Sequence, residues 1–177
     1  MIIIIICLTF CLLFIATIHQ FLKLGEKMKK ILFTVLLFVA TFANALSIGD
    51  STPTFDIKDQ FEKAHKISPD SKTILVAGDK GTSEILRDYL LTKDKGFLES
   101  NKSNYVADIS GMPSLIAKWF ALPKMKEYPF SILLVDEEQT KSFTKKEDTI
   151  TVYTLTDGKV SDIKFIKTAE ELAAVFK

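Results

Sequence analysis

Cysteine is almost absent from this 177-residue sequence, whose only two are Cys7 and Cys11. The chain after Met28 therefore offers no disulfide, no thiolate nucleophile and no cysteine metal site. Histidine is also scarce, because His65 is the only one after residue 45. A Ser-His-Asp triad would have to use His65, and the sequence has no G-x-S-x-G pattern. The polar neighbours of His65 instead favour a solvated surface histidine.

An excess of one charge is missing as well. Basic and acidic residues number 23 and 22, for a net charge of +1, which argues against a nucleic-acid-binding protein. Residues 1–45 carry four lysines and one glutamate, so residues 46–177 have a net charge of −2. The positive mean hydropathy of +0.20 comes largely from the N-terminal part. Residues 46–177 have the composition of one soluble domain, long enough to bury its own core.

A signal peptide is predicted at residues 28–45. Met28-Lys29-Lys30 supplies a cationic start, residues 31–42 an apolar run, and Ala43-Asn44-Ala45 a small-x-small ending. These are the three parts of an export signal, in order and of suitable length. Cleavage is expected between Ala45 and Leu46, so the mature domain, residues 46–177, is expected in the periplasm without a membrane span.

A second apolar run, residues 2–22, precedes this signal and leaves two interpretations open. In the first, residues 1–27 are a misassigned extension and translation begins at Met28, because Gly25-Glu26-Lys27 can be encoded by a purine-rich ribosome-binding sequence. In the second, the run is a transmembrane helix, for which its length is sufficient. The lysine-rich residues 23–30 would then stay in the cytoplasm, and the following domain would again be exported.

Hydrophobic patterns predict an α/β domain with a mixed central sheet and helices on both faces. Strands are expected at 73–77, 105–109 and 130–135, after a short strand or hairpin at 54–57. One helix is expected to begin near Gly81, capped by Thr82 or Ser83, and to carry the apolar stripe Ile85, Leu86, Tyr89 and Leu90. A second helix should follow Pro113, carry Leu115, Ile116, Trp119 and Phe120 on one side, and end at Pro123. The Asp157-Gly158 turn predicts a hairpin of 150–155 and 159–166, and the Thr168–Glu171 capping box begins a last helix.

Three short phrases within this order carry a resemblance to a known family. They are G-D-x-x-P-x-F at 49–55, Tyr128-Pro129-Phe130, and Asp157-Gly158-Lys159-Val160. Together they resemble the exported, peroxiredoxin-type branch of the thioredoxin-like superfamily, nearest to the YtfJ family of small periplasmic proteins. The resemblance implies a thioredoxin-like three-layer sandwich over residues 46–177.

The chain departs from this family at its chemical positions. Residues 77–83 carry no cysteine where thiol enzymes of this fold have them, and no proline stands near Asp148-Thr149-Ile150, where a cis-proline is usual. Since a fold does not carry function without its site, neither disulfide exchange nor peroxide reduction is expected.

Other patterns give weaker indications of chemistry. Residues 78–83 could hold an anion at a helix start, although they do not match a P-loop and also suit an ordinary turn. Asp136-Glu137-Glu138 lacks the spacing of a cation site and is interpreted as an acidic strand end. The spacing of Trp119 and Phe120 favours core packing of at least one ring over an exposed anchor for a partner. Lys141, Lys145 and Lys146 are expected in a solvated turn.

We therefore expect an exported binding or interaction module without catalytic residues, metal or cofactor. Its partner would be an envelope protein or a small ligand. The candidate surface comprises Asp79, Lys80, Thr82, Asp148, Thr149 and Trp119. Two alternatives stay open: an enzyme using acid–base chemistry at Asp79 with Lys80, and an envelope scaffolding protein.

Overall fold

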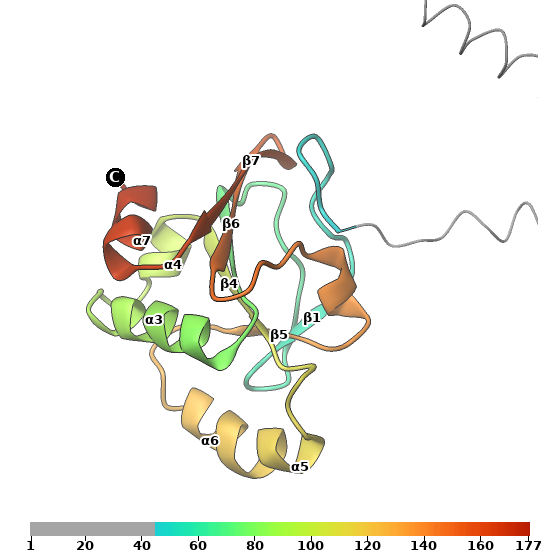
Figure 1. Ribbon diagram of the computed structural model, residues 1–177, viewed down its shortest axis with the longest axis vertical. Coiled ribbons are helices and arrows are strands. Elements are labelled where there is room, and N and C mark those ends of the chain that lie inside the picture. Colours follow the sequence, from blue (N-terminus) through green and yellow to red (C-terminus); the bar gives the residue numbers. More distant parts are fainter. Residues whose placement is uncertain (1–44) are drawn as a thin grey trace, which may run out of the picture. The chain divides into compact units, whose positions relative to one another are not determined.

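A seven-stranded mixed sheet is the centre of residues 45–177, the part of the chain that the computed structural model describes (Figure 1). Its strands, in chain order, are β1 (Ile57–Asp59), β2 (Ala64–His65), β3 (Thr73–Ala77), β4 (Ser103–Asp108), β5 (Leu133–Val135), β6 (Ile150–Thr156) and β7 (Lys159–Ile166). Their spatial order is β2-β1-β5-β4-β3-β6-β7. Strand β3 pairs in parallel with β4, and β4 with β5, whereas the other pairs are antiparallel.

The sheet has a hydrophobic core on each face. Helices α3 (Lys80–Leu91), α4 (Phe97–Ser100) and α7 (Ala169–Val175) contribute Leu86, Leu98 and Leu172 to the first core. The second core is covered by the N-terminal segment, which provides Leu46 and Ile67, and by Phe143 after the 3₁₀-helix η2 (Gln139–Ser142). All five residues of β3 are buried because both of its faces are covered.

Several elements confirm the local predictions. Strand β3 has the expected bounds, and β6 and β7 form a hairpin whose turn residues Asp157 and Gly158 both have positive φ, as a type I′ turn requires. Helix α7 begins at a reciprocal capping box, in which the Glu171 amide donates to Thr168 Oγ1 and the Thr168 amide to Glu171 Oε2.

Other elements differ from the predictions. The first strand lies at 57–59 rather than at 54–57, and helix α4 lies between α3 and β4, where no helix was predicted. Strand β5 is shorter than expected. In the residues before it, the buried side chain of Gln60, rather than a neighbouring strand, provides the hydrogen-bond partners of the backbone. Gln60 Nε2 donates to the carbonyl of Phe130 at 2.8 Å, and its Oε1 accepts from the amide of Ile132 at 2.9 Å.

The second predicted helix is a longer, composite segment. It consists of α5 (Ser114–Ile116), the π-helix η1 (Ala117–Ala121) and α6 (Leu122–Met125), called the α5–α6 segment below. The expected end at Pro123 is wrong, because Pro123 lies in the first turn of α6. A proline lacks one backbone donor and crowds the preceding turn, and the wider turns of the π-helix leave room for it.

The predicted signal peptide at 28–45 and the extension or helix at 1–27 fall almost wholly outside the described residues. Among residues 45–177, no helix is long and apolar enough to cross a bilayer.

Candidate functional site

Helix α3 starts directly after β3, at a cap made by Asp79. Asp79 has an extended backbone, and its Oδ1 accepts from the amide of Thr82 at 2.8 Å. Thr82 completes a capping box, since its Oγ1 accepts from the Asp79 amide at 3.2 Å. The expected cap at Thr82 or Ser83 is therefore wrong by three or four residues. Both Asp79 and Thr82 are suitable cap types, and the end of β3 at Ala77 decides between them.

A cavity of about 570 Å³ lies beside this helix start. One side is formed by α3, the floor by β4, and the other side by the α5–α6 segment and the residues on either side of it. Its lining is mainly apolar, from residues such as Ala107, Ile109, Met112, Met125 and Ile132. Such a concave, mostly apolar cavity with a few polar groups is typical of a small-molecule site.

The polar groups of the cavity come from separate elements. Arg87 and Ser83 belong to α3, Tyr105 to β4, and Tyr128 precedes β5. Tyr105 is only 2% exposed, and this burial raises its pKa to about 12, although the neighbouring Ser83 hydroxyl acts in the opposite direction. The Tyr105 hydroxyl therefore stays protonated at neutral pH and can donate a hydrogen bond.

Arg87 is partly neutralised. Its Nε donates to Oδ1 of Asp88 at 2.8 Å, and this bond raises the pKa of Arg87 despite partial burial, with a smaller contribution from Tyr128. A guanidinium has five N–H donors, so the pair with Asp88 leaves others for a ligand.

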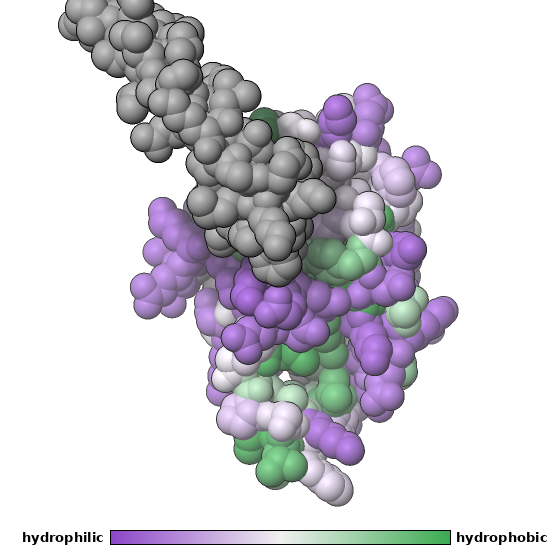
Figure 2. All heavy atoms as spheres, turned by 90° about the vertical axis from the view of Figure 1, so that its right-hand side faces the viewer, coloured by the Kyte–Doolittle hydropathy of each residue, from purple (hydrophilic) through white to green (hydrophobic). Residues whose placement is uncertain are grey.

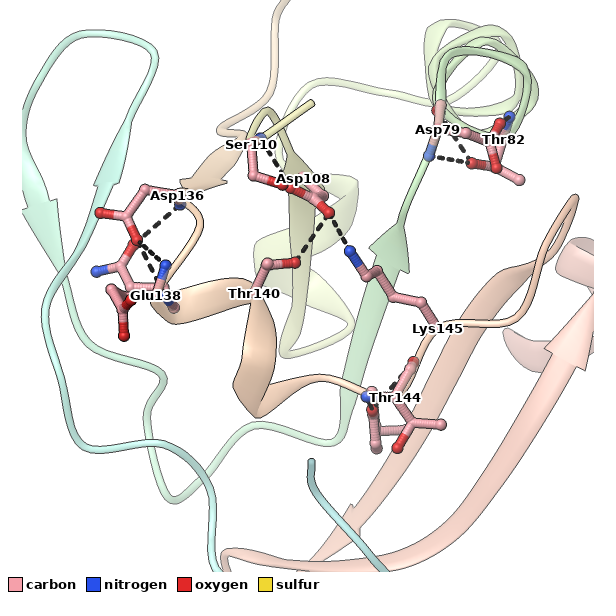
Figure 3. A network of polar contacts seen from close by, with 11 residues as sticks. Asp79, Thr82, Asp108, Ser110, Asp136, Glu138, Thr140, Thr144 and Lys145 are labelled. Carbon is pink, nitrogen blue, oxygen red and sulfur yellow. Dashed lines mark hydrogen bonds and ion pairs between the residues drawn. The ribbon is translucent and has the colours of Figure 1, made fainter. Parts of the chain in front are cut away.

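Asp108, at the end of β4, is a second polar centre on the cavity wall. Figure 3 shows Thr140 and Lys145 converging on its carboxylate. Thr140 Oγ1 donates to Oδ2 at 2.9 Å, Lys145 Nζ pairs with the same oxygen, and the Ser110 amide donates to Oδ1 at 2.8 Å. Burial pushes the pKa of Asp108 upward, but these bonds outweigh it and hold the pKa below its usual value. Asp108 is therefore a buried, charged carboxylate.

Lys145 also closes the loop that follows β3. A Cβ on Gly78 would lie 3.1 Å from Cδ of Lys145, so the lysine stem lies against the Gly78 backbone. Lys145 lies in an exposed loop, as expected, but its ion pair with Asp108 across the end of the sheet was not predicted.

The structure brings together only part of the predicted surface. Asp79 and Lys80 line the cavity, whereas Thr82 is buried in the helix cap. Asp148 and Thr149 are not among the lining residues, and the hydroxyl of Thr149 donates to the Lys146 carbonyl. Trp119 also lies outside the cavity and is exposed, as are the other three residues of its stripe, Leu115, Ile116 and Phe120. The expected core packing of Trp119 and Phe120 is therefore wrong.

The remaining sequence candidates have structural partners. His65 is not a free surface histidine, because its Nε2 lies 2.7 Å from Oδ2 of the buried Asp59. Burial alone would raise the pKa of Asp59, but hydrogen bonds from His65 and the amides of Lys63 and Phe61 lower it. Asp136 accepts the amides of Glu138 and Gln139 in the turn that leads into η2, as Figure 3 shows for Glu138. Within residues 45–177, no cluster of three His, Cys, Asp or Glu could hold a metal ion.

Sequence reasoning missed Arg87, Tyr105, Tyr128 and Asp108. One signal was present: Arg87 is the only arginine among 23 basic residues. Arginine is the side chain suited to paired hydrogen bonds with carboxylate or phosphate, so a solitary arginine on an amphipathic helix indicates a candidate anion-binding position.

Three solved structures show what this fold resembles. A candidate thiol:disulfide interchange protein, DsbE, from Chlorobium tepidum is 13% identical, with a TM-score of 0.52 over 74% of this chain and 94% of that chain. A candidate protein disulfide isomerase from Bacteroides thetaiotaomicron is 14% identical, with a TM-score of 0.50 over 74% and 86%. The thioredoxin domain of a thiol-disulfide oxidoreductase from Bacteroides vulgatus is also 14% identical, with a TM-score of 0.48 over 75% and 100%.

At these identities the likeness shows the fold alone: residues 45–177 have a thioredoxin-like fold with a mixed sheet and a C-terminal hairpin and helix. No protein-family model matches the sequence, and no curated protein matches it significantly.

Proposed function

We propose that the protein is an exported thioredoxin-like binding domain without thiol chemistry, which holds a small organic ligand in the cavity beside Asp79. The cavity itself is the observation that carries this proposal. It combines about 570 Å³ of mainly apolar space with the hydroxyls of Tyr105, Tyr128 and Ser83 and the guanidinium of Arg87. A ligand with an apolar part and one carboxylate or other strong acceptor suits the cavity, because the apolar part would contact the apolar lining and the acceptor would bind the donor groups.

The absence of thiols supports binding rather than redox exchange. The chain has cysteines only at positions 7 and 11, and cleavage after Ala45 would remove both. Without a thiolate, neither disulfide exchange nor peroxide reduction by a cysteine can occur. On the same sequence phrases as before, we place the mature protein nearest to the periplasmic YtfJ family.

The surroundings of Leu46 support the proposed cleavage site. Leu46 is only 7% exposed and belongs to the second core. Its amide donates to the Ser142 carbonyl at 2.9 Å, and its carbonyl accepts from Thr144 Oγ1 at 3.2 Å. Cleavage before Leu46 would keep the whole core, and the new terminal ammonium could donate the same bond to Ser142.

The contacts of Asp79 do not favour the enzyme alternative. A general base takes up a proton during the reaction, and a protonated carboxyl group is a weaker hydrogen-bond acceptor. Oδ1 of Asp79 already accepts the Thr82 amide, and this bond stabilises the start of α3. Catalysis at Asp79 would compete with the cap.

The test uses the complete gene, expressed in a Gram-negative host with a C-terminal tag, and the protein recovered from the envelope fraction. N-terminal sequencing should begin at Leu46, and the protein should show no disulfide reductase turnover with insulin. Octanoate and phenylacetate, added as probes, should raise the melting temperature. Recovery from the cytoplasm, reductase turnover, or no response to either probe would contradict the proposal.

Two variants locate the binding. Tyr105→Phe and Arg87→Gln should each weaken probe binding about tenfold, because each removes a hydrogen bond to the acceptor group. Tyr89→Phe is the matched control, since Tyr89 is a buried tyrosine that does not line this cavity. Equal losses in all three variants would contradict binding in the cavity.

A further inference from the structure

The outer side of the α5–α6 segment exposes four large apolar side chains. Leu115, Ile116, Trp119 and Phe120 are 69%, 47%, 68% and 69% exposed. Their spacing of i, i+1, i+4 and i+5 places them on one side of a helix. Figure 2 shows hydrophobic residues gathered at the lower end of the molecule, where Figure 1 places α5 and α6.

The opposite side of the segment is the one attached to the domain. Leu122 and Met125 are partly buried and pack against the first core. The segment is therefore apolar on two sides, and only one of them is covered within residues 45–177. Leaving the outer four in water is unfavourable, so this face is suited to a second apolar environment.

The charges around this face are positive. Lys118, Lys124 and Lys126 lie on or directly after the segment, against the single acidic residue Glu127, although Lys124 also lines the ligand cavity. All three lysines are exposed, and none makes an ion pair within residues 45–177. Aromatic and aliphatic side chains on one face with lysines at its borders are typical of a helix that lies in a membrane interface.

We propose that the outer face of the α5–α6 segment binds the surface of an anionic lipid bilayer. Trp119, Phe120, Leu115 and Ile116 would enter the region between headgroups and acyl chains, and the lysines would contact lipid phosphates. The twelve residues of the segment span at most roughly 18 Å along the surface, judged from the rise of an α-helix.

Charge, rather than area, favours a bilayer as the occupant of this face. The four side chains expose roughly 500 Å², judged from the full areas of such side chains. A bilayer requires no complementary shape, and its anionic headgroups match the local excess of lysine.

Trp119 makes the proposal directly measurable, because it is the only tryptophan in the chain. The protein recovered from cells carrying the complete gene is mixed with vesicles of equal parts phosphatidylethanolamine and phosphatidylglycerol, or of phosphatidylcholine alone. Anionic vesicles should shift the Trp119 emission to shorter wavelength, brominated lipids should quench it, and salt should weaken both effects. An unchanged emission spectrum, or equal binding to phosphatidylcholine, would overturn the proposal.

Variants identify the face that binds. Phe120→Ser should weaken partition into anionic vesicles about tenfold or more, because one aromatic side chain would no longer enter the bilayer. Phe61→Ser is the matched control, since Phe61 is 57% exposed and lies outside the segment. Equal effects of the two variants would refute binding through this face. A concentration-dependent dimer that Phe120→Ser abolishes would also refute it, and would assign the face to a second copy of the chain.

The α5–α6 segment forms one side of the ligand cavity, but the four apolar residues of its outer face do not line that cavity, so the two proposals can be tested separately. Arg87→Gln should lose probe binding but keep vesicle binding, whereas Phe120→Ser should do the reverse. Failure of either proposal is therefore distinguishable from failure of the other.

Discussion

Asp108→Asn should destabilise the protein in a pH-dependent way. The Asp108 side chain is only 4% exposed, and its carboxylate accepts three hydrogen bonds. Asparagine can keep the bond from the Ser110 amide, but its amide nitrogen would face two donors, Lys145 and Thr140. Lys145 can turn toward water, which limits the cost, so we expect a loss of about 2 kcal/mol in the free energy of unfolding at pH 7.

The pH dependence follows from the lowered pKa of Asp108. A carboxylate whose pKa is lower in the folded than in the unfolded protein contributes stability above its unfolded pKa of about 3.9. That contribution is lost as the pH falls through the lower, folded value. The wild-type protein should therefore lose its advantage over Asp108→Asn in this acidic range, and the two proteins should approach equal stability.

Urea unfolding at pH 7 and pH 3, followed by far-ultraviolet circular dichroism, measures this difference. Tryptophan emission is a poor probe of unfolding here because Trp119 is already exposed. Asp162→Asn is the matched control, since Asp162 is half exposed and its pairing with Lys164 is worth at most about 1 kcal/mol. A stability difference between wild type and Asp108→Asn that is the same at both pH values would refute the electrostatic argument.

Two further predictions concern single side chains that complete backbone structure. Gln60→Ala should lower the free energy of unfolding by about 3 kcal/mol, because the Phe130 carbonyl and the Ile132 amide would lose their partner. Urea unfolding measures it, and a loss below about 1 kcal/mol would show that water replaces the side chain. Asp79→Ala should cost about 1 kcal/mol in the same assay, and Asp79→Asn much less, because asparagine also caps helices. Equal costs for the two Asp79 variants would mean that the charge, rather than the hydrogen bond, stabilises α3.

Local rules identified the elements whose causes lie within a few residues. The Asp157-Gly158 turn and the Thr168–Glu171 capping box each depend on neighbouring side chains, and both occur as predicted. The strand at 73–77 was equally predictable, because an apolar run of that length is suited to the centre of a sheet. The signal peptide and its cleavage site stay predictions.

Features built by distant residues were missed. The two side-chain hydrogen bonds of Gln60 join it to backbone groups about seventy positions further along the chain. The cavity brings together side chains from α3, β4 and the segment before β5, and the pairing of Lys145 with Asp108 spans 37 positions. No spacing rule predicts such contacts, because they depend on how the elements pack.

The apolar stripes of α3 and of the α5–α6 segment have the same spacing but lie in different surroundings. The amino-acid order alone determined that the thiols precede Met28, that residues 46–177 can form one α/β domain, and which residues share a helix face. Only the tertiary structure decided that Leu86 and Leu90 of α3 enter the core while Trp119 and Phe120 face outward. Periodicity determines which side chains point in the same direction, but the packing of the whole sheet determines what lies in that direction.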